Sequence, residues 1–164
     1  MNSILRKKCK KINIILTDVD CVLTDGGMYY TENGEMLKKF NARDGMGVEL
    51  LLSNKIKTIF MTKENSQIVK KRAEKVKAAA VYLNVKNKDK ELKKICRKFK
   101  ITSEEIAYIG DDVNDIPIMK KIGFSLTPAD GNEKVKKISD HVCSLSGGHG
   151  VFREVADLIL MLKS

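Results

Sequence analysis

The chain of 164 residues is poor in aromatic side chains and in proline. Tryptophan is absent, aromatic residues make up 5% of the chain, and there are two prolines. A core must therefore be built mainly from isoleucine, leucine, valine and methionine, which suits a buried parallel sheet. With 43% hydrophobic residues, the chain has the size and apolar content of one domain.

The four cysteines lack the short spacings of a metal knuckle or of a disulfide framework. A reduced, cytoplasmic setting is the simplest interpretation. Long apolar runs are also missing, because the run that follows the basic N-terminus stops at Asp18. That run is too short for a signal sequence or a membrane span, so we expect no targeting segment and no membrane association.

The formal net charge is +10, which raises the question of a nucleic-acid partner. Most lysines fall at helical spacings with few aromatic residues between them, a pattern typical of solvated helix faces. We therefore expect no nucleic-acid partner. A positive field that steers an anionic substrate towards the site is the alternative explanation of the charge.

Short apolar runs of strand type alternate with helical periodicity along the chain. The predicted strands are 12–17, 58–61, 79–82 and 106–109, and the predicted helices are 44–54, 66–76, 89–99, 113–121 and 150–162. This alternation predicts βαβ crossovers, and so a flavodoxin-like α/β fold whose parallel sheet has helices on both faces. Ligands should gather beyond the carboxyl ends of the strands.

One segment, residues 26–40, interrupts the alternation. Asn33-Gly34 stands between two runs that favour strands, which predicts a β-hairpin flap. The glycine-rich segment 147–150 predicts a loop that is mobile and able to close over a site. We see no linker, so we expect a single domain over residues 1–164.

Two acidic clusters carry the strongest chemical signal. Asp18 and Asp20 follow the first predicted strand, and a run of three aspartates, Asp111, Asp112 and Asp115, follows the strand at 106–109. Because both strands belong to one parallel sheet, both clusters should lie at the same edge. Carboxylates without a cation are costly there, and together they form an oxygen-rich site suited to Mg²⁺.

Two further residues fit a phosphoryl group at this edge. The strand 58–61 delivers Thr62 to it, and Lys88 opens the helical run after the next strand. A hydroxyl, an ammonium and a carboxylate-bound Mg²⁺ are the groups that stabilise phosphoryl oxygens.

This order of residues resembles the haloacid-dehalogenase phosphatases. Their pattern is D-x-D, then a threonine at a strand end, then a lysine, then G-D-D-x-x-D. Further similarity runs through 25–30, 39–45 and 147–154 to a small, capless subgroup that contains the 3-deoxy-manno-octulosonate 8-phosphate and nonulosonate 9-phosphate phosphatases. The resemblance implies the haloacid-dehalogenase fold with no cap domain, and a homotetramer in which the hairpins form a central barrel.

The resemblance also implies a role for each position. Asp18 is the nucleophile and Asp20 the general acid and base, while Thr62 and Lys88 hold the phosphoryl oxygens. Mg²⁺ is held by Asp18, by the backbone carbonyl of Asp20 and by Asp111. Asp112 and Asp115 form an outer shell around the metal, and Asn41, Arg43 and Arg72 contact phosphate or sugar.

Two departures from the family pattern affect different properties. Cys21 replaces a glycine, so its backbone must avoid a φ open only to glycine, and activity could become sensitive to oxidation there.

Lys63-Glu64 replaces a Gly-Arg pair typical of the octulosonate enzymes. Glu64 and Lys75 match the nonulosonate enzymes instead, where they would contact sugar hydroxyls and carboxylate, whereas Arg43-Asp44-Gly45 matches the octulosonate enzymes. The nine-carbon 9-phosphate is therefore slightly favoured, with the eight-carbon 8-phosphate as the alternative.

Three rival functions fit the sequence less well. A receiver-type signalling domain shares the paired acids, the threonine and the lysine, but in that family the acid pair follows the first strand and the phosphorylated aspartate follows a middle one. A catalytically silent binding module is disfavoured because every chemical position holds a competent residue. A nucleic-acid binder lacks a groove-reading motif.

Overall fold

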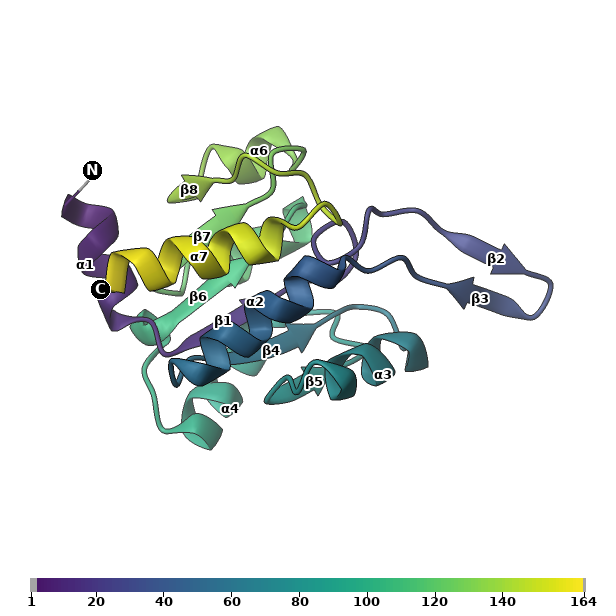
Figure 1. Cartoon of the computed structure of the whole chain (residues 1–164), viewed down its shortest axis with the longest axis horizontal. Coiled ribbons are helices and arrows are strands. Elements are labelled where there is room, and N and C mark those ends of the chain that lie inside the picture. The colour runs from purple at the N-terminus through teal and green to yellow at the C-terminus, as the bar shows by residue number, and fades with distance from the viewer. Residues whose placement is uncertain (1–2, 164) are drawn as a thin grey trace.

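A six-stranded parallel sheet organises the computed structural model, which describes residues 3–163 (Figure 1). All five strand pairings in this sheet are parallel, and the spatial order is β5-β4-β1-β6-β7-β8. The strands are β1 (Ile14–Thr17), β4 (Lys57–Met61), β5 (Ala80–Tyr82), β6 (Ile106–Ile109), β7 (Phe124–Thr127) and β8 (His141–Val142). The α/β class predicted from the sequence is confirmed.

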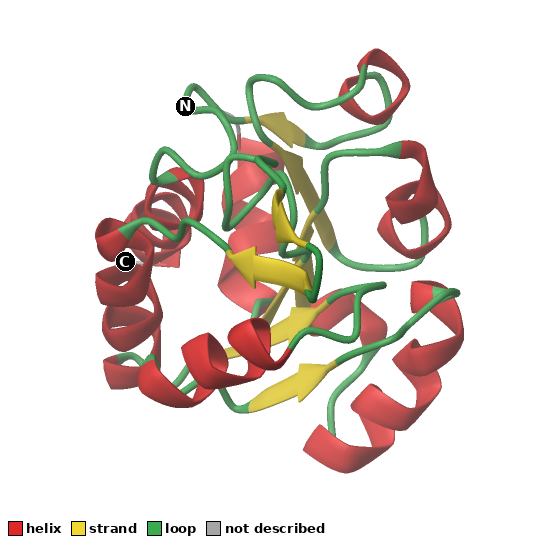
Figure 2. Ribbon diagram, turned by 90° about the vertical axis from the view of Figure 1, so that its right-hand side faces the viewer, coloured by secondary structure: helices red, strands yellow, loops and turns green. Residues whose placement is uncertain are grey.

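Helices cover both faces of the sheet (Figure 2). Because strand side chains alternate between faces, Ile15 packs in one core cluster while Ile14 and Leu16 pack in the other. The first cluster takes side chains from α1 (Ser3–Lys11), α2 (Ala42–Ser53), α3 (Gln67–Lys75) and α7 (Val151–Lys163). The second takes them from α4 (Lys88–Phe99), α5 (Ile116–Met119) and α6 (Glu133–Lys136).

The sheet grows in two directions from its centre. After β1 the chain adds β4 and β5 on one side, and it then crosses over to add β6, β7 and β8 on the other. The change of direction lies at β1, between β4 and β6. In open α/β sheets such a switch point opens a crevice at the carboxyl ends of the strands, where ligands bind.

A two-stranded hairpin projects from that end of the sheet (Figure 1). It consists of β2 (Tyr29–Thr31) and β3 (Gly34–Leu37), and no cap domain follows it. The expected hairpin is therefore present, but its turn lies one residue earlier than Asn33-Gly34. Thr31 pairs with Gly34, so Glu32 and Asn33 form the turn, and Gly34 has a φ of +107° in the strand.

The structure contains elements that the sequence analysis did not predict: β7, β8, α1 and α6. The predicted helix at 113–121 is instead a 3-10 turn, η2 (Val113–Asp115), followed by the four-residue α5. Pro117 in the first turn of α5 has no backbone N–H to continue a helix from the preceding turn. Within residues 3–163, none of the helices is long and apolar enough to cross a membrane.

Candidate active site

Three strands of the sheet end at adjacent positions and deliver polar side chains to the switch point. Asp18 follows β1, Thr62 follows β4, and Gly110-Asp111 follows β6. Thr17 of β1 pairs with Phe60 and with Ile109, so the three strand ends are in register. The prediction that both acidic clusters share one edge is confirmed.

Asp18 is buried at the centre of this edge and contacts an equally buried lysine. Its side chain accepts hydrogen bonds from the Val19 backbone N–H, at 2.7 Å, and from the ammonium of Lys88. Lys88 is the first residue of α4, and its side chain is 2% exposed. Although burial lowers the pKa of Lys88, the charges of Asp18 and Asp115 raise it above its usual value, so the lysine stays charged.

Asp115 connects the lysine to the second acidic cluster. Its carboxylate accepts from Lys88 Nζ at 2.7 Å, from the Tyr108 hydroxyl at 2.7 Å and from the Asp111 backbone N–H at 3.0 Å. Both Asp115 and Tyr108 are fully buried. Gly110 leaves the space that the Asp115 carboxylate occupies, because an added Cβ there would lie 2.4 Å from Asp115 Oδ2.

Carboxylate oxygens of Asp18, Asp111 and Asp115 lie within 4.8 Å of one another. Burial and the charge of Asp115 raise the pKa of Asp18 well above its usual value, and they raise the pKa of Asp111 to about 7. Three carboxylates share the one ammonium of Lys88, and the raised pKa values reflect their burial and mutual repulsion, which a divalent cation would relieve. An all-oxygen donor set is the type that Mg²⁺ prefers, and the residues therefore fit the predicted metal.

Asp20 lies beside this cluster and is held on both carboxylate oxygens. Lys38 Nζ is 2.5 Å from Asp20 Oδ1, and Thr62 Oγ1 donates to Asp20 Oδ2 at 3.4 Å. Thr62 is buried and also accepts a hydrogen bond from the Glu64 backbone N–H at 3.0 Å. The structure thus brings the four predicted catalytic residues, Asp18, Asp20, Thr62 and Lys88, to one place.

Cys21 adopts the left-handed conformation, with a φ of +61°, which favours glycine but is open to other residues. The Cys21 side chain is exposed, yet desolvation and the charges of Asp111, Asp20 and Asp18 raise the pKa of its thiol to about 11. A thiol of that kind forms little thiolate near neutral pH, which opposes the expected sensitivity to oxidation.

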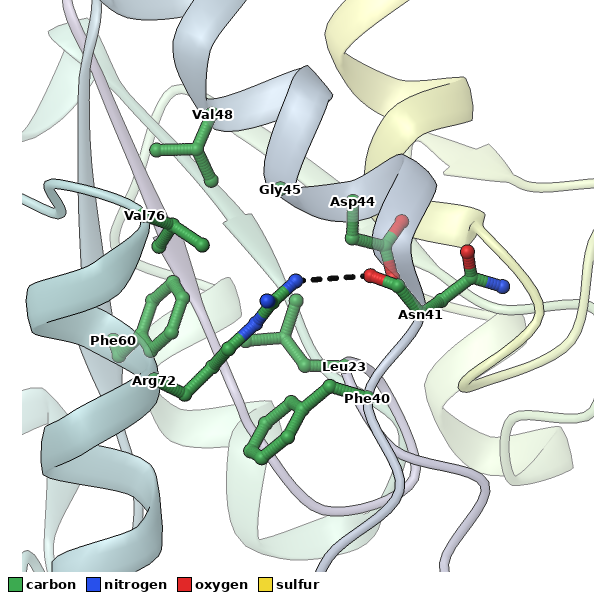
Figure 3. Close-up of a pocket in the computed structure, with 9 residues that line it drawn as sticks. All are labelled: Leu23, Phe40, Asn41, Asp44, Gly45, Val48, Phe60, Arg72 and Val76. Atoms are coloured by element: carbon green, nitrogen blue, oxygen red, sulfur yellow. Dashed lines mark hydrogen bonds between the residues drawn. The ribbon is translucent and has the colours of Figure 1, made fainter.

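Asn41 and Arg72 were expected to bind substrate, but in the structure their side chains form hydrogen bonds with other parts of the chain. Asn41 caps α2 by accepting from the Arg43 backbone N–H at 2.9 Å, and its Nδ2 donates to the Gly148 carbonyl at 3.2 Å. Arg72 donates to the Asn41 carbonyl at 3.0 Å and lies over the Phe40 ring (Figure 3). Together they border a cavity of about 10 Å³.

Four other predicted residues have exposed side chains. Arg43 lies in the first turn of α2, and Lys75 ends α3, beside an open groove of about 540 Å³ between these two helices. Glu64 lies in the loop after β4, not at the start of a helix. Asp112 caps η2 by accepting from the Val113 backbone N–H at 2.7 Å, so it is Asp115 that reaches the cluster.

The glycine-rich loop at 147–150 packs against the loop that follows Asp18. Gly147 donates to Asp130 Oδ1 at 2.9 Å, and Gly148 donates to the Val22 carbonyl at 2.9 Å. An added Cβ at Gly147 would lie 1.9 Å from the Cys21 carbonyl oxygen, so only glycine fits this approach. These contacts tie the loop to the site, and they do not favour the mobility expected from its sequence.

His141 in β8, Cys143 directly after it and Glu154 in α7 form a second group of metal-ligand type. Both carboxylate oxygens of Glu154 already accept hydrogen bonds, from the Ser144 backbone N–H and hydroxyl and from the Leu145 backbone N–H. Glu154 therefore holds the chain that enters the glycine-rich loop.

Sequence reasoning missed Tyr108, Lys38 and Glu35 as members of the site. Tyr108 lies in an apolar strand, and the signal was its hydroxyl, which needs a partner when buried. Lys38 and Glu35 were assigned only to the hairpin. Nothing in their local pattern shows that the chain leaving the hairpin places Lys38 against Asp20.

The fold and this acidic edge define an α/β enzyme with an oxygen-rich cation site. A profile described as haloacid dehalogenase-like hydrolase matches residues 21–155. The chain is 36% identical over 159 residues to the 3-deoxy-D-manno-octulosonate 8-phosphate phosphatase of Haemophilus influenzae, which is 97% of this chain and 88% of that protein. The enzyme of the same name from Escherichia coli is 36% identical over 156 residues, with 95% and 83% covered.

Solved structures agree with these relatives. The cobalt-bound Haemophilus influenzae phosphatase superposes with a TM-score of 0.92 at 36% identity, covering 95% of this chain and 91% of that one. The Moraxella catarrhalis 3-deoxy-D-manno-octulosonate 8-phosphate phosphatase, solved with a magnesium ion, a phosphate ion and a KDO molecule, gives 0.94 at 32% identity, with 99% and 93% covered.

The chain therefore belongs to the haloacid dehalogenase-like hydrolases, in the capless subfamily of the octulosonate-phosphatase type. It is a phosphoric monoester hydrolase. The predicted family and enzyme class are confirmed.

Proposed function

We propose that this enzyme removes the terminal phosphate of 3-deoxy-D-manno-octulosonate 8-phosphate in a Mg²⁺-dependent reaction. The observation that carries the proposal is the buried Asp18–Lys88 pair beside Asp111 and Asp115 at the switch point. The relatives that share 36% identity over nearly the whole chain are named for this substrate. The eight-carbon substrate, the alternative in the sequence analysis, is therefore preferred.

Asp18 is the proposed nucleophile. Its carboxylate attacks phosphorus, the bond from phosphorus to the sugar oxygen breaks, and an aspartyl-phosphate forms. Asp20 donates a proton to the departing sugar oxygen and then takes one from the water that releases phosphate. Thr62 and Lys88 hold the phosphoryl oxygens, and Lys88 is already within hydrogen-bond reach of the nucleophile.

Mg²⁺ is the proposed cofactor, held by Asp18, the Asp20 carbonyl and Asp111, with Asp115 in the outer shell. The family resemblance places Asp112 in that shell too, although its side chain caps η2 in this chain. When bound, it would offset the repulsion between the Asp18 carboxylate and the phosphate dianion. Structures of relatives hold cobalt or magnesium, which supports a divalent ion here.

Asn41, Arg43 and Arg72 are the proposed contacts to phosphate or sugar. A nonulosonate 9-phosphate is a second candidate substrate, because Glu64 and Lys75 have the residue types that the sequence analysis associated with it. Both side chains are exposed and free to face a substrate or a neighbouring subunit.

The chain is proposed to act as one hydrolase domain over residues 1–164 and as a homotetramer. A reducing, cytoplasmic setting also stays a prediction. It agrees with the four cysteines, Cys9, Cys21, Cys96 and Cys143, all being unpaired.

The test compares kcat/KM on both sugar acid phosphates for the wild type and for Asp18→Ala. We expect the octulosonate 8-phosphate to be the better substrate, EDTA to abolish turnover, and added Mg²⁺ to restore it. Asp18→Ala should lose several orders of magnitude in kcat while keeping its thermal unfolding. Appreciable Mg²⁺-dependent turnover by Asp18→Ala would refute the covalent mechanism.

Glu64→Arg tests the substrate preference separately. If Glu64 selects the nine-carbon acid, this variant should lose activity on the nonulosonate phosphate and keep it on the octulosonate phosphate. Higher kcat/KM of the wild type on the nonulosonate phosphate would overturn the proposed substrate and leave the reaction class intact.

A further inference from the structure

Lys38 belongs to the hairpin by sequence, yet its side chain lies in the active site. It directly follows β3, and its side chain is only 7% exposed. Its ammonium is 2.5 Å from Asp20 Oδ1 and 2.7 Å from Glu35 Oε1. A lysine this well covered is uncommon unless it is paired, and Lys38 is paired with two carboxylates at once.

Glu35 and Ser66 hold the Lys38 side chain in place through a series of polar contacts. Ser66, the buried residue that precedes α3, donates to Glu35 Oε2 at 2.6 Å. Glu35 in turn fixes Lys38, and Lys38 fixes Asp20. Since Thr62 donates to the other oxygen of Asp20, that carboxylate is held from the end of β4 and from the hairpin.

We propose that Lys38 is a positioning residue for Asp20, which orients the general acid and stabilises the carboxylate left after proton donation. This inference rests on the proposed function, in which Asp20 is that acid. An ammonium in hydrogen-bond contact with a carboxylate is a strong, charge-assisted interaction. The contact costs no reorganisation during the reaction, because Glu35 and Ser66 already hold the lysine in place.

The proton balance of the reaction leaves Lys38 charged throughout. In the first step Asp18 bonds to phosphorus, the sugar oxygen leaves, and Asp20 gives it a proton and becomes a carboxylate paired with Lys38. In the second step that carboxylate takes a proton from water, whose oxygen bonds to phosphorus. The Asp18 carboxylate and inorganic phosphate are released.

The neighbouring lysine provides a matched control. Lys39 is next in sequence and forms an ion pair with Asp25 at 2.9 Å, but its side chain is 60% exposed. Lys38→Met and Lys39→Met therefore remove the same charge from adjacent positions directly after β3. Only the first removes it from Asp20.

The experiment measures kcat/KM on two substrates that differ in their need for a proton. A sugar alkoxide leaves poorly without protonation, whereas p-nitrophenolate leaves unaided. kcat/KM covers steps up to transfer of phosphate to Asp18, so hydrolysis of the shared aspartyl-phosphate does not mask the difference. General acids contribute about 10²- to 10⁴-fold, and we expect Lys38→Met to lose about 10- to 100-fold on octulosonate 8-phosphate.

On p-nitrophenyl phosphate the same variant should lose less than about threefold, and Lys38→Arg should recover part of the loss on the sugar. Lys39→Met should match the wild type on both substrates. Equal losses by Lys38→Met on the two substrates would overturn the inference, because a lysine that only supports the fold or binds phosphate affects both alike. If Lys38→Met does not fold, Lys38→Gln replaces it, with the same expected outcomes.

Asp20→Asn separates this inference from the proposed function. It should show the same selective loss on the sugar phosphate, larger than that of Lys38→Met. If Asp20→Asn loses equally on both substrates, the acid role itself is wrong. If Asp20→Asn is selective and Lys38→Met is not, the acid role stands and the role of Lys38 falls.

Discussion

Cys21 occupies the left-handed region of φ directly after Asp20, the proposed general acid. A residue with a Cβ is strained there by about 1–2 kcal/mol, and glycine is free of that strain but loses about 0.5–1 kcal/mol of chain entropy. Cys21→Gly should therefore raise the free energy of unfolding by about 0.5–1 kcal/mol, measured by urea denaturation. Cys21→Ala removes the thiol and keeps the strain, so an equal gain in that variant would contradict the explanation.

Asp44 is a second residue in an unfavourable environment, because its burial disfavours the ionised carboxylate. It is buried in α2, its Oδ1 accepts from the Arg153 backbone N–H at 2.9 Å, and its Oδ2 has no hydrogen-bond partner among the described residues. Burial raises its pKa from 3.8 to about 6, although the Arg153 N–H and the Arg72 charge act against the rise. The folded protein therefore binds this proton more tightly than the unfolded chain does.

The sign of the pH effect follows from that difference. The stability from the protonated form of Asp44 is fully present below pH 3.8 and is lost as the pH rises through about 6. We expect Asp44→Asn to lack this loss, so its stability relative to wild type should improve by on the order of 2–3 kcal/mol between about pH 3.5 and about pH 8. A constant difference between the two proteins across urea titrations at these pH values would contradict it.

At the scale of the elements, Arg72 joins α3 to the base of the hairpin. Its guanidinium donates to the Asn41 carbonyl and lies 5.5 Å from the centre of the Phe40 ring (Figure 3). Arg72→Met keeps the apolar stem and removes both interactions, so it should lower the free energy of unfolding by about 1–2 kcal/mol. Arg72→Lys, which keeps the charge, should lose less.

Enzyme kinetics distinguish this structural role of Arg72 from the substrate contact that the family resemblance implies. If Arg72 acts through the fold, Arg72→Met should show lower thermal stability with KM for the sugar phosphate near that of the wild type. A large rise in KM at unchanged stability would assign Arg72 to substrate binding instead.

The elements with strong local patterns were predictable from the sequence. The four predicted strands and four of the five helices lie within two residues of their predicted positions, because each combines an apolar run with a clear period. Strand β7 (Phe124–Thr127) alternates large apolar and hydroxyl side chains, and this weaker signal was missed. Strand β8 has two residues, and its formation depends on pairing with β7.

The site was predictable only where the chain delivers residues at strand ends. Asp18, Thr62 and Asp111 follow strands, so the parallel sheet places them together. Lys88 could be placed because it opens a helix. Lys38 could not, because its position depends on where the chain after β3 returns to the edge of the sheet, and no local period encodes that long-range contact.

At the scale of the whole molecule, the hairpin forms a separate two-stranded sheet that does not join the main sheet of its own chain. An isolated two-stranded hairpin is marginally stable, and a flat exposed edge invites pairing with another chain. Apolar side chains on this hairpin are exposed in the single chain: Met28 (73%), Tyr29 (42%), Tyr30 (58%), Met36 (63%) and Leu37 (40%). This surface agrees with the family resemblance, which implies four copies paired through their hairpins in a central barrel, with neighbouring subunits covering the open sites.

A charge in the middle of this surface tests the assembly. Tyr30→Glu should convert the tetramer to smaller species in light scattering, because a buried unpaired carboxylate at an interface is strongly unfavourable. Activity on the sugar phosphate should fall in parallel, since a site open to water loses the electrostatic stabilisation of phosphoryl transfer. Met161→Glu is the matched control, because Met161 is 55% exposed on α7, away from the hairpin, and it should change neither property. A wild-type protein that is monomeric and fully active at assay concentration would disprove the assembly. A Tyr30→Glu variant that is dissociated but fully active would show that neighbouring subunits do not complete the site.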